Sequence, residues 1–263
     1  MKPVLKFATF ALAAAALSAC SNDKPADMPA QQAADSSQKS LIIATESSFK
    51  PFSYLDNQGN LVGFEIDLAN ALCEQMNAKC DIVSQDWDSL IPSLNAQKSD
   101  AIMAGMSITE ERLNAVDFSE PYFDNTLVLI GKKGDSTTID NIAGKTVATQ
   151  QATVSADYLA KNYPDAVVKT YDKQDNAYLD LASGRADLML SDVVPASDWL
   201  KTDAGAGFEV KGTPIDINDK VGIAIRKGDS LKADFDAALA SLKTNGKYDE
   251  ILAKYFDTQA VGK

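Results

Sequence analysis

A short polar segment, Ser107-Ile-Thr-Glu-Glu-Arg112, carries the residue types of a carboxylate receptor. Ser107 has capping-box spacing with the glutamate three residues later, and Thr109 is a second candidate N-cap. Arg112 then falls in or beside the first turn of a helix, where a cation is better tolerated if an anion lies next to it. Backbone N–H groups, two hydroxyls and a guanidinium can together hold a carboxylate. Alternatively, Arg112 pairs with Glu111 or Asp117 on the surface.

Asp192 is the second residue that could bind a charged group. It follows an apolar run at 188–190 and precedes Val193-Val-Pro. One interpretation makes Asp192 the N-cap of the next helix. The other makes its carboxylate the acceptor for an ammonium group. Arg112 and Asp192 could then hold the two charged ends of a zwitterion, provided that the fold brings them together.

The composition of the 263-residue chain excludes several classes of function. Lys and Arg number 25 against 37 Asp and Glu, a net charge of −12. This balance argues against binding to nucleic acids or to anionic lipid surfaces. The chain has no histidine, which excludes Ser-His-Asp and Cys-His catalysis and His-rich zinc or iron sites. We expect no metal and no cofactor.

The first forty residues have the pattern of an export signal followed by a linker. Two lysines precede an apolar run at 7–17, too short to span a membrane. The run ends in Leu17-Ser-Ala-Cys20, which resembles the bacterial lipoprotein cleavage box, so residues 1–19 would be removed and Cys20 acylated. The alternative is an ordinary secretory signal cut near Ala19. Residues 20–40 are polar and rich in Pro, Ser and Gln, which predicts a flexible tether.

The remaining cysteines, Cys73 and Cys80, can pair in an oxidising compartment. The apolar spacing at 64–76 predicts a helix. Seven residues of continuous helix would hold the two Cα atoms about 10 Å apart, too far for a disulfide. If they pair, the helix must end between them, and Asn77 is the candidate stop. Two unpaired buried thiols are the alternative.

Short apolar runs alternate with helical patterns along the rest of the chain. The predicted strands lie at 41–44, 101–103, 126–130, 146–148, 188–190 and 221–225. The predicted helices lie at 66–76, 87–97, 152–162, 177–183, 231–244 and 247–255. This alternation predicts an α/β fold with largely parallel sheets.

An internal repeat indicates two similar lobes. Residues 94–103 match residues 181–190 position by position, each with a helix end, a basic residue two before an aspartate, and a buried strand. In open α/β sheets, ligands bind beyond the carboxyl ends of the strands. Two lobes could therefore face each other across a cleft.

Several longer motifs resemble the periplasmic polar amino-acid-binding proteins of ABC importers (solute-binding protein family 3), above all their arginine- and lysine/arginine/ornithine-binding members. The resemblance spans residues 41–256, and its motifs lie at 62–69, 87–94, 100–112, 118–122, 222–229 and 246–256. It implies two Rossmann-like α/β lobes joined by two hinge strands near 124–126 and 214–221, the type II periplasmic binding protein fold. Lobe 1 would comprise 41–125 plus 219–263, and lobe 2 would comprise 126–218. Cys73 and Cys80 fall where basic amino-acid binders of this family carry a disulfide.

The resemblance also assigns roles to residues at the two charged ends of the ligand. Arg112, with Ser107, would bind the α-carboxylate. Asp192, with the Gly105 carbonyl and Ser107, would take the α-ammonium. In the second lobe, family members present a Gly-Thr-Thr or Gly-Ser-x turn to the carboxylate. This chain has Ala-Thr153-Val154 there, so the second hydroxyl is missing.

Residues that would select the ligand side chain form a second group by the same resemblance: Glu46, Phe49, Trp87, Gln150 and Ser155. An acid beside two aromatic rings suits a guanidinium or ammonium group. Alternatively, Phe49 and Trp87 are ordinary core residues and Glu46 is a solvated charge.

These resemblances predict an extracytoplasmic, lipid-anchored substrate-binding protein that closes on a basic L-amino acid and delivers it to an ABC permease. We expect a monomer in the periplasm that contacts the membrane through its lipid only. Arginine is favoured, with lysine, ornithine and histidine as other ligands. Another polar amino acid such as glutamine or cystine, a dehydratase-like enzyme on this fold, and an adhesin or sensor lipoprotein are the alternatives.

Overall fold

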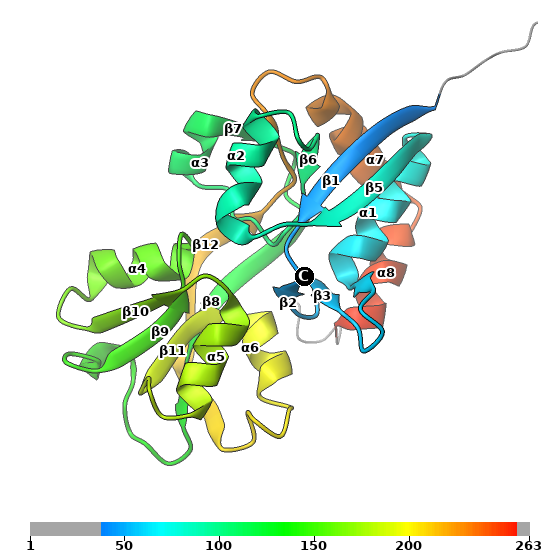
Figure 1. Cartoon of the computed structure of the whole chain (residues 1–263). Coiled ribbons are helices and arrows are strands. Elements are labelled where there is room, and N and C mark those ends of the chain that lie inside the picture. Colours follow the sequence, from blue (N-terminus) through cyan, green and yellow to red (C-terminus); the bar gives the residue numbers. More distant parts are fainter. Residues whose placement is uncertain (1–37, 257–263) are drawn as a thin grey trace, which may run out of the picture. The chain divides into compact units, whose positions relative to one another are not determined.

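The computed structural model describes residues 38–256. The predicted signal peptide 1–19, the lipidated Cys20 and all but the last residues of the tether 20–40 lie outside the described residues. Two five-stranded sheets and one three-stranded sheet organise the described part of the chain (Figure 1). No helix within residues 38–256 is long and apolar enough to cross a membrane.

The first sheet has the strand order β5-β1-β6-β13-β7. Strands β5, β1 and β6 run parallel, and β13 pairs antiparallel with both β6 and β7. The bounds are β1 (Lys39–Thr45), β5 (Ala78–Ser84), β6 (Ala101–Ile102), β7 (Val116–Phe118) and β13 (Ala224–Arg226). A small antiparallel sheet joins it, formed by β2 (Ser48–Phe49), β3 (Ser53–Leu55) and β4 (Leu61–Val62).

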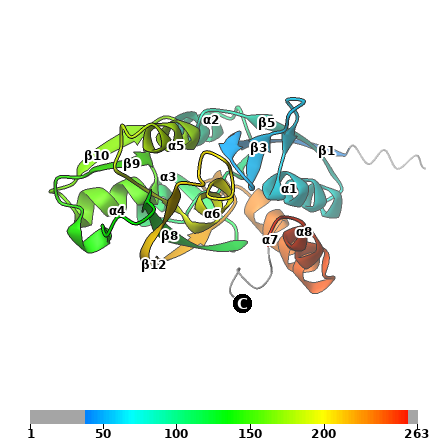
Figure 2. The ribbon, with the colours of Figure 1, turned by 90° about the horizontal axis from the view of Figure 1, so that it is seen from below.

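Helices cover both faces of the first sheet because side chains alternate along each strand. Leu41 and Ile43 of β1 pack on one face, in a core with α1 (Phe64–Gln75), α7 (Leu231–Thr244) and α8 (Lys247–Tyr255). Figure 2 shows these three helices grouped together. Ala44 points to the other face, where the 3-10 turn η1 (Trp87–Ser89) and α2 (Leu90–Asn95) pack.

The second sheet repeats this plan with the order β10-β9-β11-β8-β12. Its bounds are β8 (Phe123–Lys132), β9 (Thr146–Gln150), β10 (Val167–Tyr171), β11 (Leu188–Asp192) and β12 (Phe208–Val221). One face carries α4 (Val154–Asn162), and the other carries α5 (Gln174–Ala182) and α6 (Val193–Trp199). The 3-10 turn η2 (Ile139–Asn141) lies between β8 and β9. The two-lobe α/β architecture expected from the sequence is confirmed.

Each five-stranded sheet is mixed, which corrects the expectation of largely parallel sheets. Strands β9, β10 and β11 are parallel, but β8 pairs antiparallel with β11 and β12. A parallel neighbour needs a crossover connection, usually a helix. Strand β8 instead follows β7 of the first sheet after a short link, and β13 follows β12 of the second sheet in the same way. Neither connection contains a helix, so no strand–helix–strand pattern in the sequence fixes the direction of β8 or β13.

The chain passes twice between the sheets, through β8 and β12. These strands pair with each other where they leave the first lobe, Phe123 opposite Val221 and Asn125 opposite Asp219. The hinge segments proposed from the sequence fall on this ribbon (Figure 1). The lobe boundaries at 125/126 and 218/219 stay predictions, because both strands continue through them.

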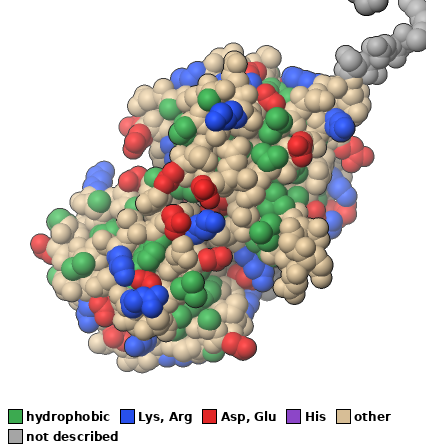
Figure 3. Space-filling model, in the orientation of Figure 1, with side chains coloured by type: hydrophobic (Ala, Val, Ile, Leu, Met, Phe, Trp, Pro, Cys, Tyr) green, Lys and Arg blue, Asp and Glu red, His purple; other side chains and the backbone are tan. Residues whose placement is uncertain are grey.

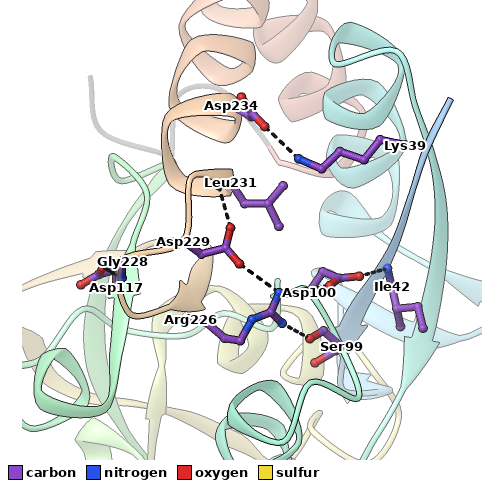
Figure 4. Close-up of polar contacts among 10 residues, drawn as sticks. All are labelled: Lys39, Ile42, Ser99, Asp100, Asp117, Arg226, Gly228, Asp229, Leu231 and Asp234. Carbon is purple, nitrogen blue, oxygen red and sulfur yellow. Dashed lines mark hydrogen bonds and ion pairs between the residues drawn. The ribbon is translucent and has the colours of Figure 1, made fainter. Parts of the chain in front are cut away.

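The internal repeat corresponds to the same backbone connection in each lobe. Asp100 N–H donates to the Ile42 carbonyl at 2.7 Å, and Asp100 Oδ2 accepts from Ile42 N–H at 2.9 Å. Asp187 makes the same two bonds with Thr146, each at 2.9 Å. In lobe 1, Arg226 also binds Asp100 (Figure 4). The repeated aspartates therefore tie β1 to the start of β6 in the first sheet, and β9 to the start of β11 in the second.

Cys73 and Cys80 form a disulfide, with Cα atoms 6.1 Å apart. Helix α1 ends at Gln75, and Asn77 adopts φ 50° before β5 begins at Ala78. The predicted helix stop is thus confirmed, and the alternative of two unpaired thiols is wrong. The bridge fastens the end of α1 to the edge strand β5.

Candidate functional site

A cavity lies at the carboxyl ends of β1, β6, β9 and β11. All eleven residues singled out as ligand-binding candidates line it, together with Ala104, Thr149 and Gln174. The candidates are Glu46, Phe49, Trp87, Gly105, Ser107, Arg112, Gln150, Thr153, Val154, Ser155 and Asp192. The two lobes therefore place their strand ends around one shared space.

Arg112 occupies the short helix α3 (Glu110–Ala115), whose N-cap is Thr109 rather than Ser107. The Thr109 hydroxyl accepts the Arg112 backbone N–H at 3.2 Å. The Arg112 guanidinium donates to the Ser107 carbonyl and, across the cleft, to the Ala152 carbonyl, both at 2.9 Å. It also lies 5.2 Å from the centre of the Trp87 ring.

The surface pairing considered for Arg112 is not what the structure shows. Asp117 pairs with Lys227 at 3.1 Å instead. Burial lowers the pKa of the Arg112 guanidinium from its ordinary value, although Asp219 and Asp157 oppose the shift. Arg112 is therefore a partly desolvated cation inside the cleft. Its positive charge can attract an anion that enters the cavity.

The turn before α4 supplies the facing wall. Thr153 is the N-cap of α4: its hydroxyl accepts from Ala156 N–H at 3.3 Å and donates to the Gln150 carbonyl at 2.8 Å. Val154 and Ser155 belong to the first helical turn, whose N–H groups have no intrahelical acceptor. A helix N-terminus favours a negative charge, so the backbone N–H groups of this turn can bind an anion at the cavity wall.

Asp192 is the N-cap residue of α6 by position, but its side chain makes no capping bond. Its carboxylate instead accepts Asn125 Nδ2 at 2.8 Å, and the same amide donates to Asp219 at 2.8 Å. Asp219 also accepts the Ser107 hydroxyl at 3.1 Å. Burial first, and then the Asp219 charge, raise the pKa of Asp192 to about 7. Two carboxylates thus share one amide at this end of the cavity.

Glu46 lies at the lobe 1 wall and is 4% exposed. It accepts Gln150 Nε2 from the other lobe at 3.2 Å, and the Ser48 hydroxyl at 3.4 Å. Burial raises the pKa of Glu46 to about 7. The interpretation of Glu46 as a solvated charge is therefore wrong. The buried carboxyl faces a cavity with few donors to balance its charge.

Phe49 and Trp87 combine core packing with contact to the cavity. They are 5% and 8% exposed, and each belongs to a hydrophobic cluster. A Cβ on Gly105 would lie 2.4 Å from the Phe49 ring, so only glycine allows this ring to lie against the backbone. Trp87 Nε1 donates to the Ala152 carbonyl at 3.1 Å. The two interpretations of these aromatic residues are thus compatible.

Sequence reasoning missed several residues around the cavity. Glu65 is buried behind it and accepts Gly105 N–H at 2.6 Å and the Tyr122 hydroxyl. Asp219 and Asn125 lie on the crossing strands, and Gln174 begins α5. No strand-end or capping pattern in the sequence marks these positions. Asp219 and Asn125 come together only because β8 pairs with β12.

Comparisons with known proteins show the family and fold of this chain. The model of the bacterial extracellular solute-binding proteins, family 3, matches residues 41–258. The lysine/arginine/ornithine-binding periplasmic protein of Escherichia coli is 39% identical over 234 residues, 85% of this chain and 90% of that protein. The L-arginine-binding protein of Pseudomonas aeruginosa is 38% identical over the same shares. The structure of an ancestral arginine-binding protein bound to arginine aligns with a TM-score of 0.80 and 38% identity, covering 84% of this chain and 99% of that chain.

Proposed function

The chain belongs to the bacterial extracellular solute-binding proteins of family 3, and from this premise we propose that it binds a basic L-amino acid between its lobes. Arginine is the favoured ligand, ahead of lysine, ornithine and histidine. The protein works in the periplasm and delivers its ligand to an ABC permease. It acts as a monomer anchored by a lipid on Cys20.

One observation carries the proposal: three charged side chains from both lobes converge on a single cavity. Arg112 lies on the lobe 1 side, Asp192 ends a lobe 2 strand, and Glu46 lies on the lobe 1 wall. An α-amino acid offers a carboxylate to Arg112 and an ammonium to Asp192. A basic side chain places a second cation near Glu46, whose desolvated carboxyl is stabilised by ionic pairing.

The surface supports a cationic ligand at longer range. Figure 3 shows acidic and basic side chains interspersed over one face of the molecule. The long-range field therefore follows the net charge of −12, which favours the approach of a cation.

Binding without turnover is the activity we propose. The carboxyl groups of the cavity are engaged by amides and hydroxyls, as Glu46 is by Gln150 and Ser48. The names of the related proteins describe ligand binding. Mass spectrometry of a bound amino acid recovered unchanged would support binding, whereas a dehydrated product would favour the enzyme alternative.

Calorimetric titration of the purified protein tests the proposal. The panel is the twenty common amino acids plus ornithine and citrulline. We expect one basic amino acid to bind tightest at 1:1 stoichiometry. A neutral or acidic amino acid binding tightest would overturn basic selectivity. Citrulline has the shape of arginine without its charge, so the difference between the arginine and citrulline affinities measures the contribution of the charge that faces Glu46.

A further inference from the structure

Gln174 lines the cavity, but neither the motifs nor the resemblance singled it out. It is the first residue of α5 and is 4% exposed. Gln150 Nε2 donates to the Asp172 carbonyl at 3.3 Å, which places the start of α5 beside Gln150 and hence beside Glu46. Gln174 therefore lies in the part of the cavity wall that includes Gln150 and Glu46.

A chain of hydrogen bonds engages the nitrogen of the Gln174 amide. The Ser191 hydroxyl donates to the Asp192 carbonyl at 3.4 Å, so its oxygen accepts from Tyr178 Oη at 3.4 Å. Tyr178 Oη then accepts from Gln174 Nε2 at 3.3 Å. Burial raises the pKa of Tyr178, which keeps its hydroxyl protonated as this donor. The amide oxygen Oε1 is engaged by no hydrogen bond within residues 38–256, so it is the acceptor that Gln174 can offer to a ligand in the cavity that it lines.

The neighbouring amide is held in the same way. Gln150 Nε2 donates to Glu46 and to the Asp172 carbonyl, so its oxygen is also the uncommitted atom. This end of the cavity thus offers the Glu46 carboxylate and two amide oxygens. It is an array of hydrogen-bond acceptors spread over three side chains from two lobes.

Resting on the proposed function, we infer that Gln174 is a specificity residue that favours the guanidinium of arginine over the ammonium of lysine. A guanidinium carries five N–H donors in a rigid plane and can reach acceptors on two sides at once. An ammonium is a compact point charge with three donors, and its pairing with Glu46 satisfies its charge. Tyr178 acts as a positioning residue, because it sets the direction of the amide.

The ratio of the arginine and lysine dissociation constants tests this role. Gln174→Leu removes the acceptor while keeping the apolar volume. We expect arginine affinity to fall roughly tenfold or more, as for the loss of one hydrogen bond to a charged group. Lysine affinity should change by less than roughly threefold. Gln75→Leu, at an exposed glutamine that ends α1, is the matched control and should change neither value.

Tyr178→Phe provides a second variant that leaves the Gln174 side chain in place. The ring keeps its stacking on Trp199, whose centroid lies 4.8 Å away. Without the phenol oxygen, the amide can turn its nitrogen toward the ligand, so the preference for arginine should fall again. An unchanged ratio in both variants overturns the role of Gln174. A wild-type protein that binds no basic amino acid overturns the proposed function itself.

Discussion

Arg112 is a single side chain that connects both lobes across the cavity. Its guanidinium donates to the carbonyls of Ser107 and Ala152, one in each lobe, and lies over the Trp87 ring. A carboxylate is a stronger acceptor than a carbonyl. These contacts hold the guanidinium inside the cleft, where the proposed function has it bind the ligand carboxylate.

Replacing Arg112 by alanine should nearly abolish binding. The ligand carboxylate would be desolvated without its charged partner, at a cost of about 3 kcal/mol or more, so we expect affinity to fall at least about 100-fold. Isothermal titration calorimetry measures the loss. Arg185→Ala, which removes an exposed arginine that pairs with Asp180 in lobe 2, should bind normally. Wild-type affinity in the Arg112 variant would contradict the site.

Glu46 predicts a pH dependence of stability in the protein without added ligand. Its carboxyl ionises near 4.5 when unfolded but near pH 7 when folded, so the folded state binds the extra proton in between. Stability should therefore fall as pH rises through this window, by up to about 3 kcal/mol. Glu46→Gln removes this contribution but leaves those of Glu65 and Asp192, whose pKa values burial also raises to about 7. Thermal melts at pH 5 to 8 should therefore show the stability of the variant rising relative to wild type. The exposed Glu250→Gln variant should follow wild type.

Candidate site residues could be predicted from the sequence wherever a local pattern marks them. Arg112 and Thr153 stand beside helix starts, and Asp192 and Glu46 follow buried strands. The cavity collects all of these positions because strand ends share one edge of each sheet. Gln174 could not be predicted in this way. Its side chain contacts Tyr178 on the same helix, and Tyr178 in turn contacts Ser191, which comes close to it only in the folded lobe.

At the scale of elements, the β9–α4 turn carries backbone strain at the cleft. Ala152 adopts φ 54°, in the left-handed region that favours glycine. The strained backbone turns its carbonyl toward both Trp87 Nε1 and Arg112. The strained conformation of Ala152 thus allows its carbonyl to accept two hydrogen bonds from the other lobe.

Ala152→Gly should stabilise the protein by about 0.5–1 kcal/mol. Relief of the left-handed strain exceeds the added entropy of the unfolded chain, and the carbonyl keeps its position. Urea denaturation measures the change. Ala160→Gly, at an exposed position inside α4, should destabilise by about 1 kcal/mol instead. Equal losses in both variants would show that the turn is unstrained.

Helices and buried strands, including the short β6 and β13, were predictable, whereas edge strands and the strands of the small sheet were not. Helices α7 and α8 match the expected ranges because their apolar residues repeat with the helical period. Strand β10 is an edge strand with a mostly exposed pattern, and β5 is another. Strands of two or three residues, such as β2 and β4, are too short to show a period. Pairing with a neighbour, rather than sequence pattern, makes them strands.

At the scale of the whole molecule, the lobes also touch outside the cavity. Gln151 Nε2 donates to Asp88 across the cleft. Two exposed ion pairs add to this, Lys50 with Asp198 at 3.4 Å and Lys173 with Asp86 at 3.9 Å. Exposed ion pairs contribute little. These contacts can therefore bias lobe closure without locking it, which leaves the bound ligand to shift the population.

Gln151→Ala isolates closure from direct ligand contact, because Gln151 does not line the cavity and its loss changes no charge. Apparent affinity equals the affinity of the closed form multiplied by the fraction of protein that is closed. Loss of one hydrogen bond of about 1 kcal/mol should therefore weaken arginine binding severalfold. Small-angle scattering should show a larger radius of gyration than wild type before arginine is added, and the same radius at saturation. Gln58→Ala, at an exposed turn of lobe 1, is the control. Unchanged affinity together with unchanged scattering would mean that β8 and β12 alone set the position of the lobes.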